Sequence, residues 1–247
     1  MFSNRYIFTF SVIMVVIVAT ILALLATALQ PFQEQNIRIE KMQYILNSAH
    51  IENDVENAES LYDQHVVMEY VIDEQGNILE TYSADNTDVT ERGFDINLKE
   101  QMTQFNKTSA AHFPVFVIAK GSDTLYSLPV RGKGLWGPIW GYIALKNDFN
   151  TIEGAVFDHK GETPGLGAEI NTKPFQDQFI GKQIFDENGE FVSVAIVKGG
   201  VANSKIPEIH GVDAISGGTI TSDGTSDMIR DGLNYYLPFI SKQQSHE

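Results

Sequence analysis

Hydrophobic and polar positions divide the chain into an apolar N-terminal stretch and a longer region of mixed polarity. Residues 6–29 form a run of 24 positions without a charged side chain. At about 1.5 Å per residue, a helix of this length reaches about 36 Å and can cross a hydrocarbon core of about 30 Å. Ala26-Thr27-Ala28 also has the small residues of a signal-peptide cleavage site. A signal peptide has an apolar region of only about 7 to 15 residues, so we predict a retained transmembrane helix.

The segment after this span carries a second helical pattern. Gln30-Pro31 is expected to stop the first helix, because proline lacks a backbone donor. Apolar residues then recur at helical spacing at Ile39, Met42, Ile45 and Leu46. They predict either an amphipathic stalk or one wall of the soluble core. The predicted segments are a short N-terminal segment at 1–5, a transmembrane helix at 6–29, a helical linker at 30–60 and a soluble domain at 61–247.

The soluble region alternates short apolar runs with turn residues, which predicts antiparallel strands. One hairpin is expected from strands at 66–72 and 78–82, joined by a turn at 73–77. A second is expected from strands at 113–119 and 124–130, joined by a turn at 120–123. Further strands are predicted at 139–145, 155–157 and 190–197, the last after the turn Glu187-Asn188-Gly189. This order is typical of an antiparallel meander and not of a βαβ series.

The C-terminal region predicts one helix with a single apolar face. Its apolar residues recur at helical spacing at Ile229, Leu233, Tyr236, Leu237 and Ile240. Ser222 or Ser226 is the expected cap, and Asp223 and Asp227 would favour the first turn. The predicted fold class is α+β, with one N-terminal transmembrane helix and a domain of antiparallel sheet with flanking helices.

Composition excludes several kinds of binding site and catalytic group. The chain has 17 Lys plus Arg and 32 Asp plus Glu, a formal charge of −15, which disfavours binding to nucleic acid or anionic lipid. It has no cysteine, which excludes disulfides, iron–sulfur ligation and thiol nucleophiles. The histidines are scattered without metal-ligand spacing, at His50, His65, His112, His159, His210 and His246. We therefore expect no metal site, and any redox chemistry must come from a bound organic cofactor.

Charges flanking the apolar span predict its orientation. Arg5 and the amino terminus precede the span. Charges of both signs follow it, at Glu34, Arg38, Glu40 and Lys41. The positive-inside rule then favours a cytoplasmic N-terminus, with residues 30–247 outside.

Glycine is concentrated in three segments, at 132–138, 159–167 and 213–222. In the third, Gly217 and Gly218 allow consecutive backbone N–H groups to converge on an anion just before a predicted helix. It is not a P-loop, because no lysine follows the glycines. On pattern alone, the alternative is a simple Gly-Gly turn between a strand and a helix.

The motifs in these segments resemble a known family, the C subunit of the sodium-translocating NADH:quinone oxidoreductase. The resemblance rests on Gly-Lys-Gly-Leu-Trp at 132–136, Gly-Glu-Thr-Pro-Gly-Leu-Gly at 161–167 and the segment at 207–222. The family motif for covalent flavin attachment, Asp-x-x-Ser/Thr-Gly-Ala-Thr, is similar to Asp213, Ser216, Gly217, Gly218 and Thr219, with Gly218 where alanine is usual.

The resemblance implies that a separate flavin transferase esterifies the Thr219 hydroxyl to the phosphate of FMN. Thr221 is the rival acceptor and lies outside the motif. The resemblance also implies that Thr163, Leu166 and Trp136 flank the flavin ring, with Glu162 and Gly165 supplied by the same motif. From the residues alone, the leucine and tryptophan could equally pack in the core.

The resemblance also implies a function. The chain would be an FMN-binding subunit in the bacterial inner membrane, with its soluble domain on the periplasmic side. It would relay electrons from NADH-derived centres toward ubiquinone, in a complex that exports sodium, with other subunits as partners. No catalytic residue beyond the flavin and no complete activity of the subunit alone are expected. The alternatives are the flavin subunit of the related Rnf electron-transport complex and a flavin-free, membrane-anchored binding module.

Overall fold

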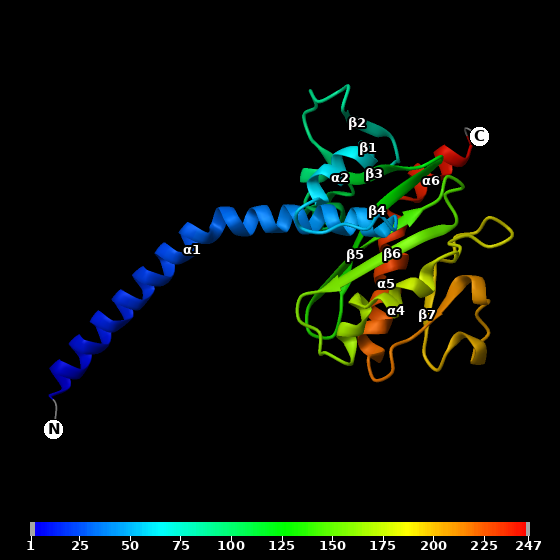
Figure 1. Ribbon diagram of the computed structural model, residues 1–247. Helices are drawn as coiled ribbons and strands as arrows, with labels where there is room; N and C mark the ends of the chain where they lie inside the picture. Colours follow the sequence, from blue (N-terminus) through cyan, green and yellow to red (C-terminus); the bar gives the residue numbers. More distant parts are fainter. Residues whose placement is uncertain (1–2, 246–247) are drawn as a thin grey trace. The chain divides into compact units, whose positions relative to one another are not determined.

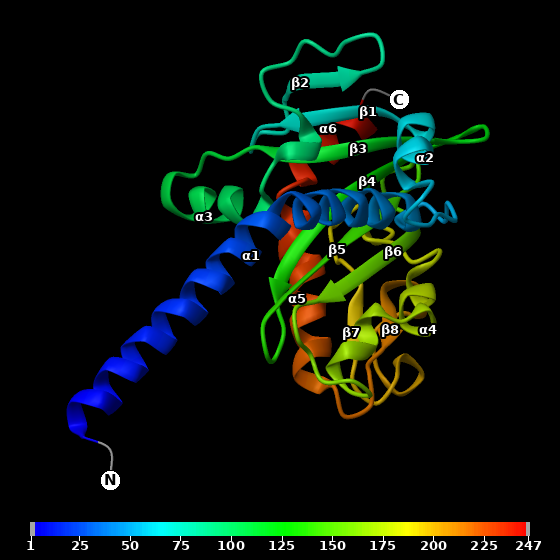
Figure 2. The same ribbon diagram turned by 60° about the vertical axis from the view of Figure 1, so that its left-hand side comes forward.

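The computed structural model describes residues 3–245, so residues 1–2 and 246–247, including His246, lie outside the described residues. The chain divides into two compact units, Met1–Lys41 and Met42–Glu247. The predicted α+β class is confirmed (Figures 1 and 2). The helices are α1 (Asn4–Ser48), α2 (Ala58–His65), α3 (Leu98–Thr108), α4 (Lys173–Gln176), α5 (Thr219–Asn234) and α6 (Leu237–Gln244). The strands are β1 (Val66–Ile72), β2 (Ile78–Ser83), β3 (Phe113–Lys120), β4 (Asp123–Lys133), β5 (Pro138–Leu145), β6 (Ile152–His159), β7 (Ala195–Val197) and β8 (Gly211–Asp213).

Helix α1 is long and apolar enough to cross a membrane. It has 45 residues and contains an 18-residue stretch of mean hydropathy 3.0, none of it buried. The hydroxyls of Thr20 and Thr27 donate to the carbonyl oxygens of Val16 and Ala23, at 2.8 and 2.9 Å. Both hydroxyls are therefore hydrogen-bonded within the helix, as a hydrocarbon core without water requires.

The expectation that Pro31 ends the first helix is wrong. Pro31 lies inside α1, which continues to Ser48. A proline within a helix removes one backbone hydrogen bond and crowds the carbonyl one turn earlier. Long helical segments on both sides outweigh this local loss, because each further residue adds its own backbone bond.

The last turns of α1 belong to the second unit. Met42, Ile45 and Leu46 are at most 1% exposed. The Ser48 hydroxyl contacts the Ser127 hydroxyl of β4 at 2.8 Å, and both side chains are buried. Of the two alternatives for this apolar pattern, these three residues therefore form a wall of the core.

The main sheet has six strands in the order β2-β1-β3-β4-β5-β6, and every neighbouring pair is antiparallel. Both predicted hairpins are confirmed. The predicted meander holds only from β3 to β6, because β3 pairs with β1 and leaves β2 at the edge. The burial of the strands explains this order, since β1 has buried residues and β2 has none. An exposed, partly polar strand suits an edge position.

Helices cover both faces of the sheet. Leu128, Val130 and Ile143 point to one face, where Met228 and Leu233 of α5 belong to the same buried cluster. Figures 1 and 2 show α5 and α6 on this side of the strands. On the other face, the Tyr142 ring lies near the rings of Tyr44 and Phe116, at 6.2 and 6.3 Å between centroids. The core of the second unit is therefore built on both sides of β4 and β5.

The C-terminal helix differs from the prediction at both its start and its end. Helix α5 begins at Thr219 with Gly218 as its cap residue, so Ser222 and Ser226 lie inside it and do not cap it. Their hydroxyls instead accept the N–H groups of Ile215 and Ile196.

The predicted single helix is two helices, α5 and α6, which are separated after Asn234. Pro238 lies four residues after Asn234, where its ring would crowd the Asn234 carbonyl in a continuous helix.

The predicted strand at 190–197 is shorter than expected. Only Ala195–Val197 forms a strand, because Val192 and Ser193 both donate their N–H groups to the Ile184 carbonyl and Ser193 has φ 61°. Strand β7 pairs in parallel with β8, which the pattern did not predict. Because β8 ends at Asp213, the attachment motif begins where this small sheet ends.

Candidate functional site

The three glycine-rich segments meet at one end of the main sheet. Residues 134–137 connect β4 to β5, residues 160–167 follow β6, and residues 214–218 join β8 to α5. The Glu162 carboxylate links them, because Oε1 accepts the Trp136 N–H at 2.8 Å and Oε2 accepts the Thr221 hydroxyl at 2.6 Å. The sequence pattern gave no sign that Thr221 has this bond.

The turn before α5 presents unpaired backbone donors. Gly217 has φ 75°, a conformation that glycine adopts without strain. Gly218 donates its N–H to the Ile215 carbonyl at 3.0 Å, and the Gly218 carbonyl accepts the Ser222 N–H at 2.9 Å. Within residues 3–245, no backbone carbonyl accepts the N–H groups of the first α5 residues, 219–221. Such a helix start is a ready site for a phosphate.

The two candidate acceptor threonines have opposite surroundings. The Thr219 side chain is half-buried, and its hydroxyl has no hydrogen-bond partner among the described residues. Thr221 is 1% exposed and its hydroxyl donates to Glu162. The Thr221 hydroxyl is therefore buried and occupied by a carboxylate, whereas the Thr219 hydroxyl has no hydrogen-bond partner among the described residues.

Gly218 occupies a tight position although its backbone does not require glycine. Its φ is −101°, which any residue can adopt. A methyl group there would lie 3.0 Å from Ile215 Cγ2 and 3.2 Å from the Leu166 carbonyl carbon. The departure from the usual alanine therefore relieves crowding and leaves the backbone donors and the Thr219 hydroxyl in place.

Several large apolar side chains on the glycine segments are exposed. Trp136 is 68% exposed and Leu166 is 41% exposed. An added carbon on Gly217 would lie 2.7 Å from Leu166 Cδ2, so Leu166 packs on the turn. Leu135 and Ile220, which were not identified from the sequence, are 47% and 58% exposed and flank Trp136 and Thr219 along the chain. Exposed apolar groups of this size at one site are typical of a binding surface.

Thr163 and Gly165 shape the loop that carries Leu166. The Thr163 carbonyl accepts the N–H groups of Leu166 and Ala168, both at 3.1 Å. Gly165 has φ 75°, and its N–H donates to Glu169 Oε1 at 2.9 Å. Both residues are exposed. Their backbone bonds hold the loop closed and leave the Thr163 side chain on the surface.

Asp213 ties the start of the motif to a neighbouring loop. Its carboxylate Oδ1 accepts the Val201 N–H at 2.7 Å, and its own N–H donates to Gln178 Oε1 at 2.8 Å. Ser216 lies exposed in the turn that follows. Neither Val201 nor Gln178 was identified from the sequence, because both contacts come from segments remote along the chain.

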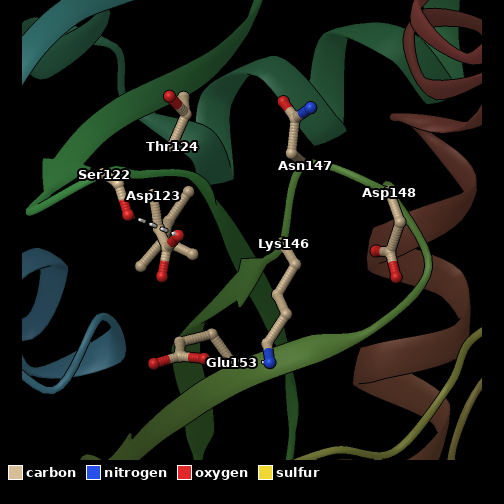
Figure 3. A pocket seen from close by; sticks show the side chains of 8 residues that line it. Ser122, Asp123, Thr124, Lys146, Asn147, Asp148 and Glu153 are labelled. Atoms are coloured by element: carbon tan, nitrogen blue, oxygen red, sulfur yellow. Dashed lines mark hydrogen bonds and ion pairs between the residues drawn. The ribbon is translucent and has the colours of Figure 1, made fainter.

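A polar cavity of about 530 Å³ lies at the opposite end of β4 (Figure 3). Strand β4 runs from Asp123 beside this cavity to Lys133 beside the glycine segments, about 33 Å along the strand. Glu153 pairs here with Lys120 and Lys146, at 3.1 and 3.6 Å. Burial alone would raise the pKa of Glu153. The hydrogen bond and charge of Lys120 lower it by more than burial raises it, so the pKa lies below its usual value. Asp123 and Asp148 also line the cavity, so its acidic groups outnumber the two lysines that pair with Glu153.

Comparison with known proteins links the glycine segments to flavin binding. A family model described as an FMN-binding domain matches residues 134–234, which include the loop before β5, the loop after β6 and α5. The chain is 30% identical to the C subunit of the Na(+)-translocating NADH-quinone reductase of Haemophilus ducreyi, over 95% of this chain and 92% of that protein. It is 29% identical to the protein of the same name from Vibrio alginolyticus, over 90% and 88% of the two chains.

Two crystal structures have a similar fold. The C subunit of the Na(+)-translocating NADH-quinone reductase from Parabacteroides distasonis is 38% identical with a TM-score of 0.74, and the match covers 86% of this chain and 97% of that one. NqrC from Shewanella oneidensis is 31% identical with a TM-score of 0.64, over 84% and 98% of the two chains. Both matches exceed four fifths of each chain, so the similarity extends well beyond the glycine segments.

Proposed function

Because the chain belongs to the family of the C subunit of the Na(+)-translocating NADH-quinone reductase, an oxidoreductase complex, we propose that it carries FMN covalently on Thr219 and relays electrons within such a complex. The observation that carries this proposal is the open first turn of α5. There the unbonded Thr219 hydroxyl stands beside three backbone N–H groups without acceptors among residues 3–245.

The residues at this turn fit a flavin phosphate. The helix start supplies donors to the phosphate oxygens, and Thr219 supplies the oxygen that forms the ester. In the attachment step, this oxygen bonds to phosphorus, its proton is lost, and the nucleotide remainder of an activated flavin leaves. A phosphodiester keeps one negative charge instead of two, which reduces repulsion in a chain of formal charge −15.

The exposed apolar side chains fit the flavin ring. Trp136 and Leu166 offer a flat aromatic and an aliphatic surface beside the acceptor turn, and Thr163 is exposed on the same loop as Leu166. When bound, the flavin supplies the electron-transfer chemistry. The chain holds the ring at the surface, where another subunit's redox centre can approach it.

The proposal includes a place in the cell and a set of partners. Helix α1 anchors the chain in the membrane, and we place the soluble unit on the periplasmic side of the bacterial inner membrane. A separate flavin transferase modifies Thr219, and the other subunits of the complex supply and accept electrons, toward ubiquinone, coupled to sodium export. The relatives carry the name of the quinone reductase, which favours this complex over the Rnf complex.

Substitution of the acceptor tests the proposal directly. In cells that contain the transferase, the wild-type chain should gain the mass of FMN less one water and give a fluorescent band after denaturation. Thr219→Ala should give neither, and its thermal unfolding should stay close to wild type because the side chain lies at a turn. Thr219→Ser keeps a hydroxyl and is the matched control for retention of flavin.

The other outcomes contradict the proposal in different ways. A wild-type band that stays dark and unmodified would favour the flavin-free binding module. Flavin on the Thr219→Ala chain would place the acceptor at another residue, with Thr221 the first to examine.

A further inference from the structure

One buried carboxylate holds the acceptor helix and the tryptophan loop together. Glu162 is 5% exposed, and each of its oxygens accepts one hydrogen bond, from Trp136 N–H and from the Thr221 hydroxyl. Its own N–H donates to His159 Nδ1 at 3.1 Å, which fixes the loop to the end of β6. Trp136 and Thr221 lie 85 positions apart in sequence, and Glu162 is bonded to both.

The surroundings of this carboxylate are shaped to admit it. An added carbon on Gly134 would lie 2.6 Å from Oε1, and one on Gly167 would lie 2.6 Å from Oε2 and 2.4 Å from the Thr221 hydroxyl oxygen. Neither glycine has a positive φ. Space for the carboxylate therefore requires glycine at these two positions, while the backbone conformation does not.

We propose that Glu162 is a positioning residue for the flavin: it acts through Thr221 and Trp136 and does not touch the ring. Thr221 is in the first turn of α5, two residues after Thr219, so its bond to Oε2 fixes that turn. The bond from Trp136 to Oε1 fixes the loop that carries the exposed indole. Glu162 thus sets the position of the phosphate acceptor relative to the aromatic surface. This inference rests on the proposed function.

The burial of the carboxylate favours this indirect role. Both oxygens are occupied by donors from the chain, and the side chain lies beneath the loop, whereas Trp136 and Leu166 are at the surface. A buried carboxylate that loses its donors, or donors that lose their acceptor, destabilise the arrangement that the bonds hold. The two bonds therefore favour one arrangement of the Trp136 loop relative to the first turn of α5.

The test uses the full chain in detergent, purified without flavin and incubated with a fixed amount of transferase and its flavin donor. Glu162→Ala removes both bonds, and we expect its rate of flavin incorporation to fall at least tenfold. Glu162→Gln is the conservative control. Its amide oxygen can accept the Trp136 N–H and its amide nitrogen can donate to the Thr221 oxygen, so it should stay within about threefold of wild type.

A second pair of variants leaves the glutamate in place. Thr221→Val replaces the hydroxyl with a methyl group of similar size, and it should slow incorporation in the same direction as Glu162→Ala. Thr221→Ser keeps the hydroxyl and should restore the rate. Combined with Glu162→Ala, Thr221→Val should add little, because Glu162→Ala has already removed the bond that Thr221→Val breaks. If circular dichroism and thermal unfolding show that Glu162→Ala does not fold, Thr221→Val and Thr221→Ser still test the positioning role of Glu162.

A spectroscopic measurement separates positioning from general damage. In the loaded fraction of Glu162→Ala and Thr221→Val, the visible circular dichroism of the flavin should weaken and its fluorescence should rise, because Trp136 is no longer held against it. Wild-type rates and spectra in folded Thr221→Val and Glu162→Ala would overturn the inference. So would a Glu162→Gln chain as impaired as Glu162→Ala. Failure of the wild-type chain to take up flavin would instead overturn the proposed function.

Discussion

Two threonines near the start of α5 illustrate how neighbouring residues acquire different roles. Thr219 is the first helical residue and leaves its hydroxyl unbonded among residues 3–245, whereas Thr221 turns inward to Glu162. Residues two apart on a helix point in different directions, so the same side chain is presented to solvent at one position and to the core at the other. Helical geometry therefore gives the two hydroxyls different surroundings, which supports the proposal that Thr219 carries the flavin.

Glu153 gives a prediction about pH at the residue scale. Its folded pKa lies below the usual value of 4.5, because the bond and charge of Lys120 outweigh the effect of burial. A carboxylate with a lowered folded pKa stabilises the fold above its unfolded pKa, and this contribution is lost as pH falls through the folded pKa. Glu153→Gln should therefore lower the free energy of unfolding by about 1 kcal/mol at pH 7.

The difference between wild type and Glu153→Gln should shrink as pH falls below 4.5 and through the lower folded pKa, because the wild-type carboxyl is then protonated as well. Urea unfolding of the full chain in detergent, from pH 3 to pH 7, measures it. Glu187→Gln, at an exposed position on the turn before Gly189, is the control and should show little pH-dependent difference. A difference that grows on acidification would contradict the assigned sign.

At the scale of elements, close packing of α5 on β4 places the acceptor turn. An added carbon on Gly224 would lie 2.3 Å from the Lys133 carbonyl oxygen, which is backbone and cannot move aside. At Gly232 the nearest atom is Val130 Cγ1 at 2.8 Å, a side chain that can adjust. The two glycines thus differ in what they face, although both lie in the same helix.

Gly224→Ala should destabilise the fold by about 1–3 kcal/mol, because α5 must move away from β4. Gly232→Ala should cost less, since alanine favours the helix by about 1 kcal/mol and the valine can shift. Chemical unfolding of both full-length variants, followed by far-ultraviolet circular dichroism, measures the difference. Equal stability losses would show that α5 does not depend on the close approach at Lys133.

The elements also show how far the sequence alone predicts this fold. Period-two runs with a turn between them identified the two hairpins of the sheet, because hairpins depend on local residues. The same local patterns did not reveal that β3 pairs with β1 or that β7 pairs with β8. They also did not reveal that the Ile184 carbonyl accepts the N–H groups of residues 192 and 193. These depend on contacts between remote segments.

The candidate site likewise has features that the sequence predicted and features that it did not. Its motifs identified Thr219, Leu166, Trp136 and Glu162 as candidates. The internal bonds of the site could not be predicted, because Glu162 reaches Trp136 and Thr221 only after β4, β5, β6 and α5 have packed. The wrong caps have a related cause: Ser222 and Ser226 have the chemistry of cap residues, but their hydroxyls are used by Ile215 and Ile196.

At the scale of the whole molecule, the two units differ in whether their apolar side chains are exposed or buried. In the first unit, the apolar side chains of residues 6–37 are exposed, as in a helix in lipid, whereas the second unit, Met42–Glu247, buries a large aromatic and aliphatic core. Because α1 crosses the boundary between them as one helix, the point where lipid ends and the folded domain begins lies within a single element. The orientation of α1 then decides which compartment contains the folded unit.

Charges at the two ends of the apolar span predict that orientation. Arg5 and the amino terminus are basic, and the segment after the span carries Glu34 and Glu40 as well as Arg38 and Lys41. We predict a cytoplasmic N-terminus, with the soluble unit in the periplasm. A reporter that is active only outside the cytoplasm should therefore work when fused after residue 247, and one that is active only inside should not.

Because Arg5 contributes half of the positive charge before the span, Arg5→Glu should lower the correctly oriented fraction, whereas Arg5→Lys should not. Activity of the cytoplasmic reporter in the wild-type fusion would reverse the topology and would put Thr219 on the side of the membrane opposite to the one proposed.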